Sequence, residues 1–454
     1  MRNNDSPTGD RIAFPGQKLF KLNGKDKYPA PHIPGEYIGK DEFSLSPKYL
    51  SEIVYWPDRF KMILDGNYFE LPPVHFEGIF TLICNFMCPH CTRRVARTKW
   101  VKGGTWDPLA EVNKDNTMPL QNLRHVIDQV ASFITDDQMG IVWGGGDPTL
   151  NPDTYEGLSY ANKKGIKSSF LTNGAFLDVN KILELEPVLI RISLNCGTEN
   201  HHRNFHGYRK KDDFFEKVIS NLYSLAKERA LRNSKTLIGV SLIVDERNID
   251  DIYCAAKHIV NAQKASSGGI DYVIVRPVFN YKHSKEDWIL LGKNTKSNLF
   301  DLVSGKGVIW NMLHDVNIPL ICIKDSFSLP PSDKLYADTD SNCLSYGLCG
   351  EIRHNGDVQL CSDTYGDPDY TIGNIFQNSL KDIWQSNKRF EVIQKINQKK
   401  CYKTKCPHNS RGHHINRFLH KIEIKKRQGH TEEVLNWASD IKKYIPQLNH
   451  SFFL

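Results

Sequence analysis

The sequence has none of the features that mark a membrane-spanning, secreted or fibrous chain. No apolar run approaches the roughly 18 residues that a transmembrane helix needs. The start, MRNNDSPTGDR, is polar, whereas a signal peptide contains an apolar stretch. Internal repeats, low-complexity tracts and nucleic-acid-binding motifs are also missing. We therefore expect a cytoplasmic, globular protein that binds neither membranes nor nucleic acids.

The bulk composition is that of an ordinary globular protein. The 454 residues are 40% hydrophobic and 24% charged, which suffices for about two or three domains with a large core. The net charge is +7, and much of the basic excess lies in HHINRFLHKIEIKKRQ, residues 413–428. Such a run is typical of a solvated helix face. A surface for an anionic substrate or partner is the alternative.

Eleven cysteines are the unusual part of the composition. A reducing compartment disfavours disulfides, so metal binding or catalysis is the better interpretation. Most of them fall in two groups. The first group is Cys84, Cys88 and Cys91, and the second is Cys343, Cys349, Cys361, Cys401 and Cys406. The others are Cys196, Cys254 and Cys322, and we expect the last two to be buried packing residues.

From about residue 75, strand and helix patterns alternate. Short apolar runs bounded by glycine or turn residues predict strands at 76–83, 139–143, 167–172, 188–194, 236–244 and 271–275. Helical spacing of apolar residues predicts helices at 120–134, 153–164, 178–186, 213–231 and 249–263. This order predicts an α/β fold with a parallel sheet and right-handed crossovers. Six units are too few for a closed barrel of eight, so we expect an open, partial (β/α)6 TIM-like barrel whose active site lies at the C-terminal strand ends.

The pattern outside that region suggests further parts of the chain. Residues 1–74 are rich in proline, glycine and aromatics and predict an irregular N-terminal extension. The other predicted parts are the barrel at 75–280, a linker with one helix (297–314) at 281–336, a cysteine-rich domain at 337–411 and a helical tail at 412–454. In the helical tail, apolar stripes predict packing surfaces, with Ile415, Phe418, Leu419 and Ile422 on one face and Val434, Leu435, Ala438 and Ile441 on another.

The first cysteine group has the spacing Cys-x3-Cys-x2-Cys, directly after the first predicted strand. Three thiolates on a tight loop can hold three corners of a cubane iron–sulfur cluster. The fourth iron then stays open for a reactant, as a catalytic metal centre requires. The alternative is a zinc knuckle that includes His90, or buried thiols, but the spacing differs from the Cys-x2-Cys pairs of structural zinc sites.

This motif resembles the signature of the radical S-adenosylmethionine (radical SAM) superfamily, and the resemblance extends over residues 75–277. It implies that Cys84, Cys88 and Cys91 hold a [4Fe–4S] cluster that cleaves S-adenosylmethionine to a 5′-deoxyadenosyl radical. A reducing donor of the flavodoxin or ferredoxin type would supply the electron. The protein itself would bind, orient and shield the reactants.

The same resemblance predicts a set of cofactor contacts at successive strand ends. Gly145, Gly146 and Asp147 match the family's Gly-Gly-Glu segment, in which the acid binds the methionine amino group; here Asp is shorter than Glu by one methylene. The further predicted contacts are Thr172 and Asn173, Ser193 and Asn195, and Arg276. Each of these positions taken alone has an ordinary interpretation as a turn or a solvated strand end.

The second cysteine group lies in Cys343-x12-Gly-x4-Cys361, followed by Cys401-x4-Cys406. Asn355-Gly356-Asp357 is a hairpin signal that places Cys361 on the returning strand. This segment resembles the C-terminal auxiliary-cluster domains called SPASM and Twitch. The complete SPASM pattern needs more cysteines than this chain offers, so the resemblance favours one auxiliary [4Fe–4S] cluster on Cys343, Cys361, Cys401 and Cys406. A zinc site on the same four thiolates is the alternative.

The resemblance predicts a radical SAM oxidoreductase or epimerase but leaves its substrate open. One hypothesis is oxidation or epimerisation of a polar small molecule, such as a sugar, aminoglycoside or nucleotide-type metabolite. A second is maturation of a ribosomally synthesised peptide. Residues 1–74 lack the periodicity of a leader-binding domain, which favours the first hypothesis. A third, from another class, is a zinc-stapled binding module without catalysis.

The role of Cys196 would distinguish oxidation from epimerisation. An epimerase must return a hydrogen atom to its substrate radical, and a thiol is a common donor. Cys196 follows the fourth predicted strand, at the mouth of the expected barrel. It is therefore our candidate hydrogen-atom donor, with a buried packing role as the alternative.

Overall fold

The computed structural model describes only part of the chain. The described residues are 21–22, 25–26, 53, 57–91, 116–133, 140–208, 212–278, 298–299, 301–303, 307–322, 342–364, 367–398, 401 and 411–444. Cys406 and most of the predicted extension and linker lie outside them, and the side chain of Ile441 is not described. No described helix combines the length and apolar character needed to cross a membrane.

One open mixed sheet organises the fold, in the order β12-β11-β10-β3-β4-β5-β6-β7-β8-β9. Neighbours from β10 through β3 to β9 are parallel, and β11 and β12 are antiparallel. The six predicted strands are confirmed as β3 (His75–Ile79), β4 (Gly140–Trp143), β5 (Lys167–Thr172), β6 (Leu189–Ser193), β7 (Leu237–Val244) and β8 (Tyr272–Pro277). The predicted partial TIM-like barrel is the observed fold.

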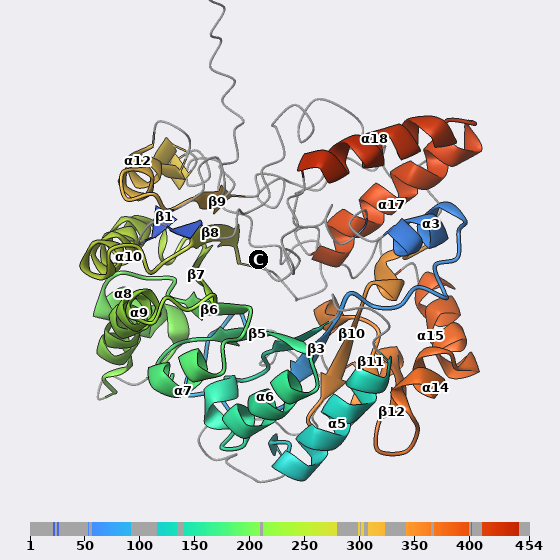
Figure 1. The fold of residues 1–454 in the computed structure, drawn as a ribbon, viewed down its shortest axis with the longest axis horizontal. Coiled ribbons are helices and arrows are strands. Elements are labelled where there is room, and N and C mark those ends of the chain that lie inside the picture. The colour runs from blue at the N-terminus through green and yellow to red at the C-terminus, as the bar shows by residue number, and fades with distance from the viewer. Residues whose placement is uncertain are drawn as a thin grey trace, which may run out of the picture.

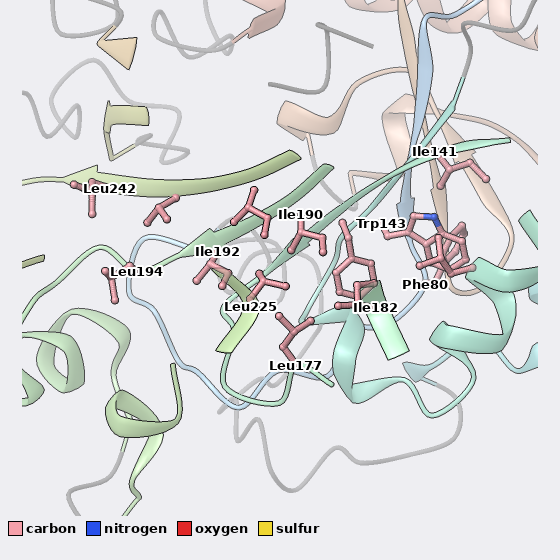
Figure 2. Packing of buried hydrophobic residues seen from close by; sticks show 14 of the residues in the cluster. Phe80, Ile141, Trp143, Leu177, Ile182, Ile190, Ile192, Leu194, Leu225 and Leu242 are labelled. Carbon is pink, nitrogen blue, oxygen red and sulfur yellow. The ribbon is translucent and has the colours of Figure 1, made fainter. Parts of the chain in front are cut away.

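Helices follow the barrel strands along the outer side of the curved sheet (Figure 1). They are α5 (Leu120–Phe133), α6 (Thr154–Lys163), α7 (Val179–Glu184), α8 (Glu199–His206), α9 (Phe214–Leu231) and α10 (Ile252–Ser266). Apolar side chains of the strands alternate onto this side, as Ile190 and Ile192 of β6 do in Figure 2. There they pack against Ile182 of α7 and Leu225 of α9, so the main core lies between sheet and helices.

A second apolar cluster covers the inner side of the sheet near the N-terminal strand ends. It joins Leu189, Tyr272 and Ile274 to Phe60 and Ile63 of helix α3 (Pro57–Leu64). The tail helices α17 (Arg411–Arg427) and α18 (Thr431–Tyr444) contribute the buried residues Ile415, Phe418, Leu419, Ile422, Val434 and Ala438. The predicted stripes are therefore largely confirmed, although Leu435 is exposed. Helix α3 lies within the segment predicted to be irregular.

The sheet is wider than the six predicted strands. Strand β9 (Leu320–Cys322), from the predicted linker, pairs in parallel with β8. At the opposite side, β10 (Cys349–Arg353) pairs in parallel with β3. The single helix predicted at 297–314 is interrupted; it has helical residues at 298–299 and 301–303, and α12 (Val308–His314) begins after Gly307.

The predicted hairpin at Asn355–Asp357 is confirmed, but Cys361 lies beyond the returning strand, which ends at Gln359. Strand β10 turns into β11 (Asp357–Gln359), which pairs with β12 (Thr371–Asn374). Helices α14 (Leu380–Trp384) and α15 (Asn387–Gln398) follow. The Trp384 ring packs edge-on against Phe76 of β3, and a Cβ at Gly350 would lie within 3 Å of both rings. The missing side chain of Gly350 thus permits the cysteine-rich segment to pack tightly on the barrel.

Candidate active site

The first cysteine loop leaves the C-terminal end of β3, where the fold places active sites. Its three cysteines are all partly exposed. The Cys84 sulfur accepts hydrogen bonds from the Phe86 backbone N–H at 3.4 Å and from Asn173 Nδ2 at 3.8 Å. Donors aimed at sulfur stabilise a negatively charged thiolate, so the environment of Cys84 suits a cluster ligand.

A buried histidine contacts the second cysteine of the loop. His206 Nδ1 lies 3.1 Å from Cys88 Sγ, and His206 Nε2 lies 3.5 Å from Asn195 Nδ2. Asn195 Oδ1 accepts from the Ile243 N–H, which fixes the orientation of the amide. Because an amide nitrogen only donates, the contact with Asn195 Nδ2 fits the tautomer in which His206 Nε2 accepts and Nδ1 carries the proton. In that tautomer the neutral His206 ring donates to the Cys88 sulfur.

Helix α8 carries this histidine and packs on the cysteine loop. The Phe86 ring lies 4.6 Å from His206 and stacks on Tyr208 at 5.3 Å. The Met87 N–H donates to the His206 carbonyl at 2.9 Å. Burial lowers the pKa of His206 to about 3, in agreement with the neutral ring. His90 points Nδ1 at the Arg247 guanidinium, 3.1 Å away.

The glycine segment after β4 is hydrogen-bonded to the chain that enters the cysteine loop. The Gly146 N–H donates to Thr81 O and the Asp147 N–H donates to Ile83 O, each at 2.8 Å. Gly145 has a φ of +110°, and a Cβ there would lie 2.5 Å from the Thr81 carbonyl. Only glycine fits so close to another backbone. The two predicted motifs therefore form one rigid unit.

The Asp147 carboxylate is 1% exposed and receives hydrogen bonds from its own chain. The donors are Thr149 N (3.0 Å), Thr149 Oγ1 (2.5 Å), Thr172 Oγ1 (3.0 Å) and Asn173 N (2.7 Å). Burial raises the pKa of Asp147, and these hydrogen bonds oppose that rise. A carboxylate offers about four acceptor positions. A cofactor ammonium would have to displace one of the two threonine hydroxyls to reach it.

The remaining predicted cofactor contacts lie at neighbouring strand ends. Ser193 ends β6 and is partly exposed, and Arg276 near the end of β8 directs Nη2 to Ser241 Oγ at 3.5 Å. Asn195 differs from them. Its side chain is 2% exposed and is held by Ile243 and His206, so in this structure it positions the histidine.

Cys196 does not face the site. Its side chain is fully buried and packs with Phe205, Val278 and Ile243. Burial also raises the pKa of this thiol far above its usual value. This geometry does not support the predicted role of Cys196 as a hydrogen-atom donor at the barrel mouth. It matches the alternative, in which Cys196 is a buried packing residue.

Two members of the second cysteine group, Cys361 and Cys401, lie near Tyr370. The Tyr370 hydroxyl and Cys401 Sγ are hydrogen-bonded at 2.9 Å. Burial and the nearby Cys401 and Cys361 thiols raise the pKa of Tyr370. Cys343 is held by a hydrogen bond from its N–H to Asn397 Oδ1. Cys349 is buried at the start of β10, next to His75 of β3. The fourth predicted ligand, Cys406, lies outside the described residues.

Comparison with known families decides what this arrangement is. The model of the radical SAM superfamily matches residues 79–253, and that of the SPASM iron–sulfur cluster-binding domain matches residues 344–407. The chain belongs to the radical SAM superfamily. Its cofactors are S-adenosylmethionine and a [4Fe–4S] cluster in the first domain, with iron–sulfur binding also in the SPASM domain.

Two relatives of this radical SAM protein illustrate how far the likeness extends. Fe-coproporphyrin III synthase of Methanosarcina barkeri is 24% identical over 172 residues, which cover 37% of this chain and 36% of that protein. The chain thus matches little more than a third of the length of that relative. The crystal structure of Streptococcus suis SuiB bound to S-adenosylmethionine matches with a TM-score of 0.50 and 14% identity, over 74% of this chain and 72% of SuiB. This second likeness concerns the fold.

The radical SAM motifs were visible in the sequence, but His206 was not recognised. Its signal is weak: His202 and His206 are spaced i and i+4 on one helix, a pattern that is common in helices without any site. Only the packing of α8 on the cysteine loop reveals the contact with Cys88.

We predict that His206→Leu lowers the reduction potential of the radical SAM cluster. Losing an N–H donor to a cluster sulfur disfavours the more negative, reduced state. A difference of about 1.4 kcal/mol corresponds to roughly 60 mV for one electron. A redox titration followed by electron paramagnetic resonance measures the shift. His201→Leu on the same helix is the control, and equal potentials in both variants would contradict the assigned hydrogen bond.

We also predict that Cys196→Ala retains 5′-deoxyadenosine formation and, once a substrate is known, its turnover. The thiol packs in an apolar cluster, so its loss leaves only a small cavity. The measurement is product formation in deuterated water. A variant that stalls while the wild type incorporates solvent deuterium would restore the donor role.

Proposed function

We propose that the protein uses the 5′-deoxyadenosyl radical to abstract a hydrogen atom from a polar small molecule, leading to oxidation or epimerisation of a sugar, aminoglycoside or nucleotide-type metabolite. The proposal of a polar substrate rests on the polar side chains of the inner face of the barrel sheet. Residues on this face alternate with those of the main core, and beyond the apolar cluster near the N-terminal strand ends many are polar. They include Glu77, Arg191, Ser193, Ser241 and Arg276.

In this proposal Cys84, Cys88 and Cys91 hold the radical SAM cluster, and Cys343, Cys361, Cys401 and Cys406 hold an auxiliary [4Fe–4S] cluster. When bound, the reduced cluster and S-adenosylmethionine supply the radical that takes the hydrogen atom. The chain's own contribution is positional. Asn173 and His206 donate to ligand sulfurs, Asp147 fixes the glycine segment, and Ser193 and Arg276 are available to contact the cofactor.

The test is anaerobic reconstitution of the full chain with iron and sulfide, followed by addition of S-adenosylmethionine and a flavodoxin- or ferredoxin-type reductant. We expect about eight irons per chain from two four-iron clusters, and 5′-deoxyadenosine detected by mass spectrometry. Zinc without iron or sulfide, together with an intact cofactor, would instead identify the zinc-stapled binding module.

The choice of substrate class needs a second measurement. A true substrate should raise 5′-deoxyadenosine formation above the rate without substrate and transfer deuterium from a labelled position to the 5′ carbon. Panels of phosphorylated sugars, aminoglycosides and nucleotides test the proposal. Stimulation by a peptide encoded near the gene, but by none of these metabolites, would favour peptide maturation instead.

A further inference from the structure

Three polar residues share the inner face of the sheet, on strands β5, β6 and β8. Ile190 and Ile192 of β6 point to the helices in Figure 2, so Arg191 between them points to the opposite, inner face. By the same alternation Ser169 lies inside next to core residue Phe170, and Tyr272 lies inside next to core residue Val273.

A glycine brings two of these side chains together. Arg191, Gly239 and Tyr272 are directly paired across β6, β7 and β8. A Cβ at Gly239 would lie 2.2 Å from the Tyr272 ring and 2.4 Å from its hydroxyl. The ring therefore lies across Gly239, with its hydroxyl directed toward Arg191.

All three residues have a buried polar atom without a hydrogen-bond partner. These atoms are Ser169 Oγ, Arg191 Nη1 and Tyr272 Oη, in side chains that are 0%, 8% and 1% exposed. The Arg191 guanidinium opposes the rise that burial causes in the pKa of Tyr272, both by its charge and by a hydrogen-bonding contact with the hydroxyl. That contact falls outside the geometry of a full hydrogen bond. Buried polar groups are nearly always paired, so three unpaired ones on one face require an explanation.

The charge of Arg191 is also uncompensated within the part of the chain that the structure describes. Two other buried arginines have carboxylate partners: Arg229 pairs with Asp271 and Arg353 with Glu351, each at 3.1 Å. Buried Arg59 and Arg389 instead donate to backbone carbonyl oxygens. No ion pair of Arg191 is found among the described residues. A buried cation without a counter-charge is strongly unfavourable, and water alone would not neutralise it.

We propose that Arg191, Tyr272 and Ser169 bind an anionic group of the substrate, a carboxylate or a phosphate. A guanidinium presents paired N–H donors that match the oxygens of either group. The Tyr272 hydroxyl, which lies over Gly239 beside Arg191, is placed to donate to the same oxygens. Ser169 adds a hydroxyl one inner-facing position away, beside Leu189. This inference rests on the proposed function, because it assigns the inner face to the substrate, and it narrows the polar substrate to an anionic one.

The position of the site distinguishes it from the cofactor. Ser193, a predicted cofactor contact, lies two residues further along β6 on the same face. At about 3.3 Å per residue, Arg191 lies about 7 Å deeper in the barrel. An anionic group held there would leave the rest of a small substrate to extend toward the cofactor.

The experiment is isothermal titration of inorganic phosphate and of succinate into the reconstituted full chain, with S-adenosylmethionine present and no reductant. We expect one site per chain in the wild type. Arg191→Met, which keeps an unbranched apolar stem but removes the guanidinium, should weaken binding tenfold to a hundredfold. Arg124→Met, which removes an exposed arginine from α5, is the matched control and should bind like the wild type.

The pattern of binding identifies the anion. Binding of phosphate alone supports a phosphorylated substrate, and binding of succinate alone supports a carboxylate. Should Arg191→Met fail to fold, Tyr272→Phe, which loses only the hydroxyl, should still weaken binding severalfold. Equal affinity in the folded variants, no binding in the wild type, or binding that S-adenosylmethionine abolishes would overturn the assignment.

Cofactor cleavage by the wild type, measured in parallel with reductant, separates the two proposals. Formation of 5′-deoxyadenosine without anion binding would leave the proposed function intact and remove the site. Anion binding without cofactor cleavage would support the anion site and contradict the proposed radical chemistry.

Discussion

Replacing Cys84, Cys88 and Cys91 together by alanine should abolish formation of 5′-deoxyadenosine and remove about half of the reconstituted iron. The three thiolates are the expected protein ligands of the first cluster, and without it there is no centre to pass an electron to the cofactor. Iron and sulfide analysis, together with chromatography of the cleavage product, measures both effects.

The matched control is the double replacement of Cys401 and Cys406 by alanine. This variant should also lose about half of the iron but keep the spectroscopic signal of the first cluster, since those thiols belong to the second cysteine group. Cofactor cleavage at the wild-type rate by the triple variant would reject the assignment of the first motif.

Asp147→Asn should weaken the binding of S-adenosylmethionine tenfold to a hundredfold. An ammonium–carboxylate hydrogen bond contributes about 1.5–3 kcal/mol, and about 1.4 kcal/mol corresponds to a factor of ten. The substitution also places an NH2 group opposite buried donors such as Thr149 N and Asn173 N. We therefore expect a lower melting temperature even without cofactor.

A second variant separates direct binding from positioning. Thr149→Val removes one hydroxyl donor and leaves the carboxylate in place. If the ammonium binds Asp147 by displacing that hydroxyl, Thr149→Val should retain or improve cofactor affinity. Unchanged affinity in Asp147→Asn, measured by equilibrium titration, would mean that the segment acts only as a turn.

The barrel strands could be predicted because their signal is local. VLIRISL and TLIGVSLIV are apolar runs bounded by loop residues, and such runs form buried parallel strands. Strand β9 spans only Leu320–Cys322, and its assignment depends on pairing with β8. A pattern of three residues carries too little information to distinguish such a strand from a loop.

The candidate site also has some parts that could be predicted from the sequence and others that could not. The cysteine spacing and the glycine segment are short-range features, so they could be recognised from the sequence alone. Arg191 is different, because in the sequence of β6 it is only a single polar residue within an apolar run. Its significance depends on the face of the sheet, on the absent side chain of Gly239 and on the lack of an ion pair with Arg191 among the described residues. None of these is visible without tertiary structure.

The parallel pairing of β10 with β3 has a consequence for synthesis of the chain. His75–Ile79 is made early, yet its partner Cys349–Arg353 emerges only after the barrel strands β4 to β9 have been made. Until then one edge of β3 keeps unpaired backbone groups that can recruit other chains. Closing so long a loop is also slow. A nascent chain stalled before residue 349 should therefore aggregate more readily than one released after the hairpin is complete.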